Sequence, residues 1–267
     1  FFYENSIKLL ETVESLKPQK TLELGCYNGI LLNYLAKLYT GEKFVGIDVE
    51  EKIIGFANER FKRNNLDFIT LDYKDIAKLN NKFDFIFSLF GIETIPSDIK
   101  FDTYKIRNNK NYLAKYKYFD NFFRLIKSVV EDNANFLPLI RITGLNSLLA
   151  FLDAGKKNNW SLKDNKIDFV KSGNFHKMNE RIPSFLLQYN TEGNTNEEID
   201  LDNFFEITKE YRDEDNLRDV YSYQENKSRF IDKIKEDSIY YEDDGNTLRY
   251  EIYKNLGIYM MFLWSTN

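Results

Sequence analysis

The segment "TLELGCYNGI", residues 21–30, combines an apolar run with two glycines separated by three residues, and it indicates how the chain around it folds. It begins as a short apolar run suited to a buried strand and ends on a turn with two glycines, Gly25 and Gly29, that opens a helix-like run. Glycine lets the backbone turn tightly with no side chain in a ligand's way, and it lets the next helix pack closely. The stretch therefore predicts the first strand and helix of an α/β sheet, joined by a turn that either binds a ligand or has a structural role alone.

Strand-like and helix-like segments alternate from this point along the first 190 residues. An amphipathic helix over about 5–16 precedes the stretch. The pattern predicts strands at 43–49, 66–72, 83–91 and 134–143, and helices at 30–39, 51–64, 117–131 and from residue 145. Such alternation is typical of parallel strands joined by right-handed crossovers.

Two later strand-like runs, 166–170 and 183–189, have a short connection without a good helix, so they should pair antiparallel. We therefore predict an α/β fold: a doubly wound, seven-stranded, mostly parallel sheet with an antiparallel last strand, over residues 1–190. The segment of about 96–111 has weak periodicity, and we expect it to be a lid-like insertion over the carboxyl edge of the sheet.

The remaining residues, 191–267, have a different composition. A polar, acidic linker leads to a strand-like run at 204–211, a helix-like run at 216–235 and three β-rich runs separated by turn signals. This pattern predicts a small C-terminal α+β module with an antiparallel meander. Its last run is apolar on both faces, so either the main domain or a partner subunit, such as the second copy in a homodimer, should cover it.

The composition of the chain restricts which partners it can bind and where it is expected to occur. The chain has 267 residues, a net charge of −5 and one cysteine. An acidic balance argues against a nucleic-acid partner, because phosphate binding draws on Lys and Arg. The longest apolar stretch, 257–264, is far shorter than the ~20 residues that cross a membrane. A single cysteine cannot form an internal disulfide, and we expect a cytoplasmic location.

The spacing of the turn restricts its ligand. A dinucleotide turn carries a middle glycine where this chain has Tyr27, and a third glycine where it has Ile30. A pyrophosphate would therefore clash or lack its cradle. A carboxylate at Glu23, two residues before the first glycine, suits a ligand with an ammonium group.

Further polar residues end the neighbouring strands. Asp48 comes 19 residues after Gly29, where a carboxylate reaches a ribose diol; Asp72 ends the third strand, where it could accept from an adenine amine. "FDFIFSLFGIE", residues 83–93, begins with an acidic residue and ends in small and polar ones. Because ligands of such sheets lie outside the carboxyl ends of the strands, these features indicate one site.

Residues 20–93 resemble the core of the class I S-adenosylmethionine-dependent methyltransferases. The resemblance rests on "LELGCYNG", "GIDV", "LDY" and "FDFIFSLFGIE", which match four motifs of the family in order. It extends more weakly to about residue 190. It implies the seven-stranded sheet with its antiparallel last strand, and S-adenosylmethionine as a cofactor lying across the strand ends.

The resemblance also implies residue roles. Glu23 and Gly25 would border the methionine part, Asp48 would hold the ribose hydroxyls, and Ser88 would lie near the sulfonium. The full set of expected cofactor-binding residues is Glu23, Gly25, Cys26, Tyr27, Gly29, Asp48, Val49, Asp72, Tyr73, Ser88 and Phe90. No metal-ligand set is apparent.

Two residues are candidates for a general base. Glu93 follows the fourth strand, and His176 is the only histidine of the chain. We expect O- or N-methylation of a small-molecule acceptor, such as a sugar or a secondary metabolite. The alternative is a catalytically silent, methyltransferase-like subunit that binds the cofactor or a partner without turnover.

Overall fold

The structure is a computed structural model, and it describes residues 2–89, 91–92, 107, 110–139, 145–171, 181–192, 198–208, 234–243, 246–255 and 258–265. Contacts between Cα atoms divide the chain into two compact units, residues 1–101 with 107–198 and residues 102–106 with 199–267. Within the described residues, no helix has the length and apolar character needed to cross a membrane.

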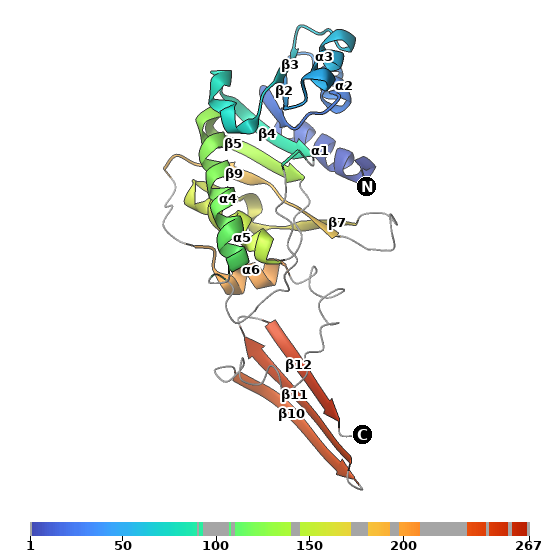
Figure 1. The fold of residues 1–267 in the computed structure, drawn as a ribbon, viewed down its shortest axis with the longest axis vertical. Helices are drawn as coiled ribbons and strands as arrows, with labels where there is room; N and C mark the ends of the chain where they lie inside the picture. The colour runs from blue at the N-terminus through green and yellow to red at the C-terminus, as the bar shows by residue number, and fades with distance from the viewer. Residues whose placement is uncertain are drawn as a thin grey trace. The chain divides into compact units, whose positions relative to one another are not determined.

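A seven-stranded sheet forms the centre of the first unit, in the spatial order β3-β2-β1-β4-β5-β9-β6 (Figure 1). Its strands are β1 (Lys20–Leu24), β2 (Lys43–Asp48), β3 (Leu66–Thr70), β4 (Phe83–Leu89), β5 (Val130–Leu139), β6 (Trp160–Leu162) and β9 (Leu187–Tyr189). The first five strands pair in parallel, and β9 is antiparallel to both β5 and β6. The predicted seven-stranded, mostly parallel sheet with an antiparallel last strand is confirmed, because β9 is the last of the seven strands in chain order.

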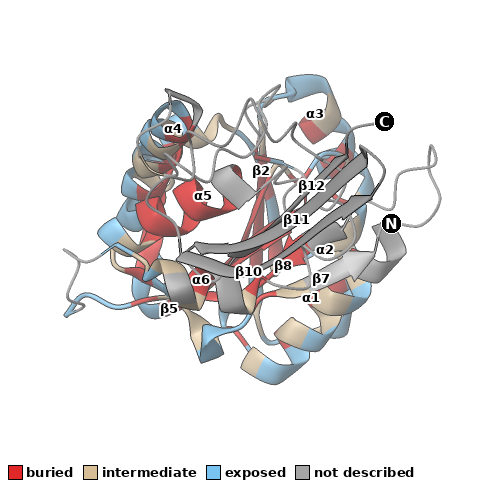
Figure 2. Cartoon of the chain, turned by 90° about the horizontal axis from the view of Figure 1, so that it is seen from below, coloured by how far each residue is buried: buried red, intermediate tan, exposed pale blue. Residues whose placement is uncertain are grey.

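Helices cover both faces of this sheet, as Figure 2 shows. On one side lie α1 (Phe2–Leu16), α2 (Ile30–Leu38) and α3 (Glu51–Arg60), and on the other α4 (Lys110–Ile126) and α5 (Leu145–Lys157). Short 3₁₀ helices are η1 (Tyr73–Leu79), η3 (Lys127–Val129) and η4 (Lys163–Asn165).

Successive side chains of β5 point to opposite faces of the sheet and pack into the hydrophobic core on each face, because side chains alternate along a strand. Leu137 and Leu139 join the cluster that contains α1, α2 and α3 residues, including Leu9 and Leu35. Phe136, which directly precedes Leu137, points to the other face and contacts aromatic rings of α4, α5 and β6 instead. The sheet is therefore buried on both faces, which fits its near-continuous apolar strands.

The last strands of the sheet differ from the prediction. The runs 166–170 and 183–189 do pair antiparallel, but as β7 (Asp168–Lys171) with β8 (Arg181–Ser184), in a separate two-stranded sheet. The main sheet is completed by β9 and by β6, which was not predicted. The side chain of Trp160 in β6 is 1% exposed and packs on aromatic rings of the core, so burial of this large ring fixes the strand.

The lid-like insertion predicted at about 96–111 lies mostly outside the described residues. Its last two residues are the first two of α4, which begins at Lys110, earlier than the predicted start at residue 117. Tyr112, in this early part of the helix, is buried and donates its hydroxyl to Asp153 of α5 at 2.6 Å. This tertiary contact supports helix where the sequence pattern is weak.

The second unit contains α6 (Leu201–Ile207) and an antiparallel sheet of β10 (Ile234–Asp243), β11 (Asn246–Asn255) and β12 (Ile258–Ser265). The predicted three-strand meander is confirmed. The predicted strand at 204–211 is wrong in its first half, where residues 204–207 are helical. The side chain of Asp200 accepts from the backbone N–H of Asn203 at 2.8 Å, so an N-cap starts a helix there. The helix predicted at 216–235 lies outside the described residues up to residue 233, and its last two residues belong to β10.

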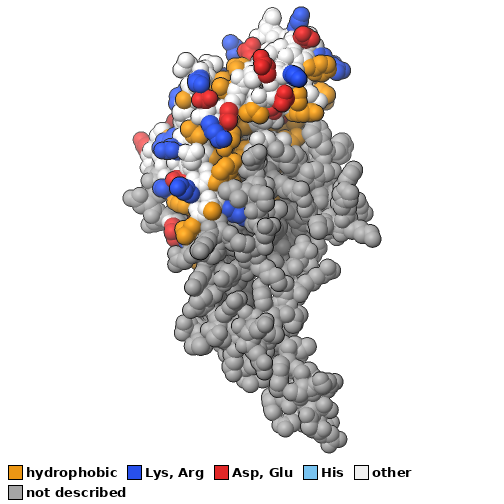
Figure 3. Space-filling view, viewed as in Figure 1, with side chains coloured by type: hydrophobic (Ala, Val, Ile, Leu, Met, Phe, Trp, Pro, Cys, Tyr) orange, Lys and Arg blue, Asp and Glu red, His pale blue; other side chains and the backbone are white. Residues whose placement is uncertain are grey.

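Charge is mixed on the surface of the first unit. On the face that Figure 3 shows, acidic and basic side chains of the described residues are interspersed among hydrophobic ones. Such mixing is typical of a globular surface without a single strong field.

Candidate functional site

The turn after β1 has an unusual backbone. Gly25 and Gly29 have φ angles of 76° and 70°, and Tyr27 between them has a φ of 47°. The backbone N–H groups of Gly25 and Cys26 both donate to the carbonyl of Ile47 in β2, at 2.9 and 3.0 Å. These hydrogen bonds connect the turn to the neighbouring strand. They help to hold Tyr27 in the left-handed backbone conformation, which is uncommon for a residue other than glycine.

The two glycines are required by close approaches as well as by φ. A Cβ atom on Gly29 would lie 2.4 Å from the ring of Phe68 in β3, so the start of α2 packs directly on that ring. A Cβ atom on Gly25 would lie 2.3 Å from the Cα of Gly91, which follows β4. The second contact joins two turns at the carboxyl edge of the sheet, and sequence reasoning missed Gly91. The signal was present in "FGIE", directly after the fourth strand.

Asp48, at the end of β2, connects to the same turn. Its Oδ2 accepts a hydrogen bond from the backbone N–H of Tyr27 at 2.9 Å, and its Oδ1 accepts from that of Glu50 at 3.0 Å. The carboxylate is partly exposed, and a carboxylate offers about four lone-pair sites. Acceptor capacity thus remains on Asp48 toward solvent, beside the turn.

Glu23 is the buried acid of the site. Its side chain is 3% exposed in the middle of the sheet, where it aligns with Gly46 of β2 and Phe87 of β4. Its Oε2 has no hydrogen-bond partner. Burial, and then the charge of Asp48, raise the pKa of Glu23 to about 8. An enclosed carboxyl oxygen without a partner, next to a second acid, could accept a hydrogen bond from a cationic group.

Cys26 has a packing role in the turn. Its Sγ atom fills the space over Gly46, where an added Cβ atom would lie 2.8 Å away. Burial, followed by the charges of Glu23 and Asp48, raises the pKa of its thiol. The side chain therefore stays a neutral thiol and is not an activated nucleophile.

Asp72 and Tyr73 follow β3 and make local contacts. Asp72 accepts from the backbone N–H of Lys74 at 2.9 Å and so caps η1. The hydroxyl of Tyr73 lies 3.2 Å from that of Tyr118 in α4, and its ring packs edge-on to Phe122. Both residues have a structural role, and their predicted place beside an adenine stays a prediction.

Ser88 connects β1 to the turn after β4. It is fully buried, donates its hydroxyl to the carbonyl of Leu24 at 2.9 Å and accepts from the backbone N–H of Gly91 at 3.2 Å. The Ser88 hydroxyl therefore hydrogen-bonds two backbone groups and holds the ends of β1 and β4 together.

Val49 and Tyr27 are, unlike Ser88, exposed side chains: they expose 65% and 61% of their surface beside Asp48.

Three predicted site residues, Phe90, Glu93 and His176, lie outside the described residues. Within the described part of the chain, no group of three or more His, Cys, Asp or Glu side chains could hold a metal ion. What the structure brings together is thus the turn of residues 25–29 with Glu23 and Asp48, at the carboxyl ends of adjacent strands.

Comparison with known proteins finds likenesses to methyltransferases. Residues 21–105 match the family model described as methyltransferase domain. The chain is 23% identical over 168 residues to the candidate methyltransferase 235L of Invertebrate iridescent virus 6, covering 61% of this chain and 52% of that protein. It is 33% identical over 84 residues to the malonyl-[acyl-carrier protein] O-methyltransferase of Acetivibrio thermocellus, covering 32% and 29% respectively. The chain thus spans about half, or less, of the length of these curated relatives.

A solved structure shares the fold. "StiE O-MT residues 961-1257" matches with a TM-score of 0.50 and 11% sequence identity, covering 79% of each chain. The matched segment of residues 21–105 contains the glycine turn, Glu23 and Asp48, and the match to a methyltransferase domain implies S-adenosylmethionine as the cofactor. Residues 21–105 thus match a methyltransferase domain, and the first unit has the fold of the class I S-adenosylmethionine-dependent methyltransferases.

Proposed function

We propose that this chain transfers a methyl group from S-adenosylmethionine to a small-molecule acceptor. The observation that carries the proposal is the buried Oε2 of Glu23, which lacks a partner next to a turn fastened to Asp48. When bound, S-adenosylmethionine supplies an activated methyl group on a sulfonium, together with the leaving group. The protein then has to bind, to orient and to exclude water.

The donor and acceptor set fits this cofactor. Glu23 would accept from the ammonium of the methionine part, and the charge of that ammonium would favour the ionised carboxylate. The free acceptor sites of Asp48 would receive the ribose hydroxyls, each such hydrogen bond to a charged group being worth ~1.5–3 kcal/mol. The exposed side chains of Val49 and Tyr27 would offer apolar surface to the adenine.

For the methyl acceptor, we propose a small molecule that receives the methyl group on oxygen or on nitrogen. The solved structure and one curated relative are named as O-methyltransferases, which supports methyl transfer to oxygen, while transfer to nitrogen remains within the proposal. A hydroxyl acceptor needs a general base, and we propose Glu93 or His176 for it. Comparing turnover of the Glu93→Gln and His176→Asn variants would assign this role once an acceptor is known.

Two measurements test the function. Isothermal titration of the full chain with S-adenosylmethionine should show saturable binding, and the absence of any heat and of any thermal shift would contradict cofactor binding. A turnover screen with labelled methyl donor against metabolite pools should then give a labelled small molecule. Binding without turnover in any pool would favour the catalytically silent subunit instead.

A further inference from the structure

Lys115, on α4, is a buried lysine that the cofactor site does not use. It is 2% exposed, and its Nζ donates a hydrogen bond to the Oγ of Ser147 on α5. The two helices run side by side in the same direction, since Phe119 contacts Phe151 one turn further along both (Figure 1). Among the described residues Ser147 is the one hydrogen-bond partner of this ammonium, so two of its three N–H donors are left for another acceptor.

No acid of the described residues balances the charge of Lys115. Burial lowers the pKa of its ammonium, and no carboxylate acts to raise that pKa. The buried acid of α5 is Asp153, which already accepts from the guanidinium of Arg107 at 2.9 and 3.0 Å and from the hydroxyl of Tyr112 at 2.6 Å. Because buried charges are normally paired, Lys115 lacks the counter-ion that its burial calls for.

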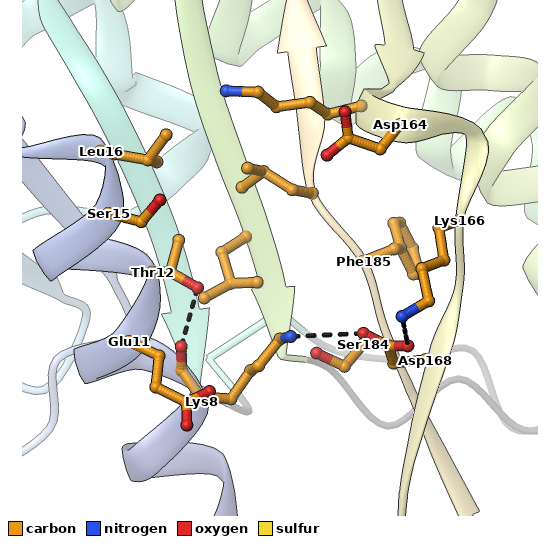
Figure 4. Close-up of a pocket in the computed structure, with 13 residues that line it drawn as sticks. Lys8, Glu11, Thr12, Ser15, Leu16, Asp164, Lys166, Asp168, Ser184 and Phe185 are labelled. Carbon is orange, nitrogen blue, oxygen red and sulfur yellow. Dashed lines mark hydrogen bonds and ion pairs between the residues drawn. The ribbon is translucent and has the colours of Figure 1, made fainter.

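The groove beside α1 is the opposite case. It has a volume of about 260 Å³ and is lined by three lysines and three acids, and Lys8 and Lys166 are both ion-paired with Asp168 (Figure 4). The charges of the groove therefore balance one another, whereas the charge of Lys115 is not balanced within the described part of the chain.

Lys115 lies near the carboxyl edge of the sheet. Tyr118, three residues further along α4, has its hydroxyl 3.2 Å from that of Tyr73, which begins η1 shortly after β3 ends. Five residues of α4 and two of α5 precede Lys115 and Ser147, so the pair is within roughly one and a half turns of both helix starts. These starts follow β4 and β5 along the chain, at the edge where ligands of such sheets bind.

The two helix starts add positive potential at this place. The N-terminus of a helix has a partial positive charge from its N–H groups. Neither α4, with 17 residues, nor α5, with 13, has an acidic residue in its first turn to offset that charge. A buried ammonium and two parallel helix N-termini therefore attract an anion to the same place.

We propose that Lys115 and Ser147 bind an oxyanion, a carboxylate or a phosphate group, on the molecule that accepts the methyl group. This inference rests on the proposed function and specifies its substrate class. Glu23 and Asp48 belong to β1 and β2, and β4 and β5 follow on the other side of β1. The acceptor therefore approaches from the side of β4 and β5, where charge-assisted hydrogen bonds to the ammonium orient it.

Binding of simple anions tests the site without turnover. The full chain, alone and with S-adenosylmethionine, is titrated with sodium benzoate, with phenyl phosphate and with benzamide as the uncharged counterpart. At least one anion should bind saturably at about 1 mM or below, and benzamide at least about tenfold more weakly. The tighter of the two anions identifies the oxyanion as carboxylate or phosphate. Equal binding of benzamide, no saturation by either anion, or displacement of S-adenosylmethionine would each overturn the proposal.

A variant localises the binding. Lys115→Met removes the charge, keeps the length of the side chain and should weaken anion binding at least about tenfold, with unchanged affinity for S-adenosylmethionine. Because it also removes an unbalanced buried charge, its urea midpoint should be no lower than that of the unmodified chain. The matched control is Lys117→Met, which removes an exposed lysine of the same helix and should change neither quantity. An equal loss of anion binding in both variants, weaker cofactor binding or a lower urea midpoint in Lys115→Met would contradict the assigned role.

A turnover screen separates this inference from the proposed function. Metabolite pools are divided by anion exchange into retained and unretained molecules before incubation with labelled methyl donor. Label in the retained molecules, with a higher KM in Lys115→Met, supports both. Label in the unretained molecules alone supports methyl transfer and overturns the anionic acceptor. Label in neither fraction would contradict methyl transfer, and with it the role of the pair in holding an acceptor, even where the simple anions bind.

Discussion

The carboxylate of Asp48 lies 2.9 Å from the backbone nitrogen of Tyr27 and accepts its hydrogen bond. The two residues are 21 positions apart, and Tyr27 has the left-handed backbone of the turn after β1. One acid at the end of β2 therefore shapes the turn and keeps acceptor sites free for a ligand. If S-adenosylmethionine binds at these strand ends, as proposed, this relationship would couple the shape of the turn to cofactor affinity.

Asp48→Ala should raise the dissociation constant for S-adenosylmethionine at least about tenfold. The variant loses the hydrogen bonds proposed to the ribose, worth ~1.5–3 kcal/mol each, and releases the N–H of Tyr27. Isothermal titration measures the change, with Asp67→Ala as the control, because Asp67 is an exposed acid of β3. Unchanged affinity in Asp48→Ala would remove this residue from the site.

Binding of S-adenosylmethionine should release a proton near pH 7. Glu23 has a pKa of about 8 and is mostly protonated at that pH, whereas a bound ammonium favours its ionised form. Affinity should therefore rise with pH between about 6 and 8. Titrations in buffers of different ionisation enthalpy count the proton, and Glu23→Gln should abolish the release. A pH-independent affinity of the unmodified chain would contradict this role.

The free energy of unfolding should fall as pH rises from about 5 to 8, because of Glu23. Its pKa is raised from 4.5 to about 8 in the fold, so the native state holds a proton that the unfolded chain has lost in this range. The stabilisation is complete below the lower value and is lost as pH passes the upper one. Urea midpoints at pH 5.5 and 8 should differ more for the unmodified chain than for Glu23→Gln. A steeper dependence in the variant would show that other groups dominate.

Gly29→Ala should destabilise the first unit by about 2 kcal/mol or more. Alanine is strained by ~1–2 kcal/mol in the left-handed region, and its Cβ would meet the ring of Phe68 at 2.4 Å. In the Phe68→Leu background, Gly29→Ala should cost less, since part of the clash is gone. Circular dichroism during urea unfolding measures both. Gly55→Ala is the matched control: this position of α3 has open space, so the substitution should stabilise by ~0.5–1 kcal/mol.

Ser88→Ala should destabilise the chain by ~1–3 kcal/mol, because the carbonyl of Leu24 and the N–H of Gly91 both lose their hydroxyl partner inside the fold. Ser161→Ala, on the exposed side of β6, should stay within about 0.5 kcal/mol of the unmodified chain. Equal urea midpoints for the two variants would mean that the hydroxyl of Ser88 does not hold the strand ends together.

Much of the fold followed from local pattern. The alternation of apolar strands with amphipathic helices predicted the order β1, α2, β2, α3, β3 and β4, and the turn signals predicted the meander of β10 to β12. The sequence-based prediction of strands failed where contacts between residues far apart in the chain determine which sheet a strand joins. Trp160 places β6 in the sheet through rings of α4 and β5, and Pro183 belongs to a second sheet although it shares an apolar run with β9.

Spacing along the chain was enough to predict the strand-to-helix turn with its two glycines, the acids at the strand ends and the likeness to a methyltransferase core. In contrast, three features became visible in the folded chain alone: Gly91 lies against Gly25, Ser88 uses its hydroxyl for two backbone groups, and Ser184 is buried with no hydrogen-bond partner for its Oγ. The reason is physical: burial and hydrogen-bond satisfaction depend on segments far apart in the chain, and no local spacing encodes which of them meet.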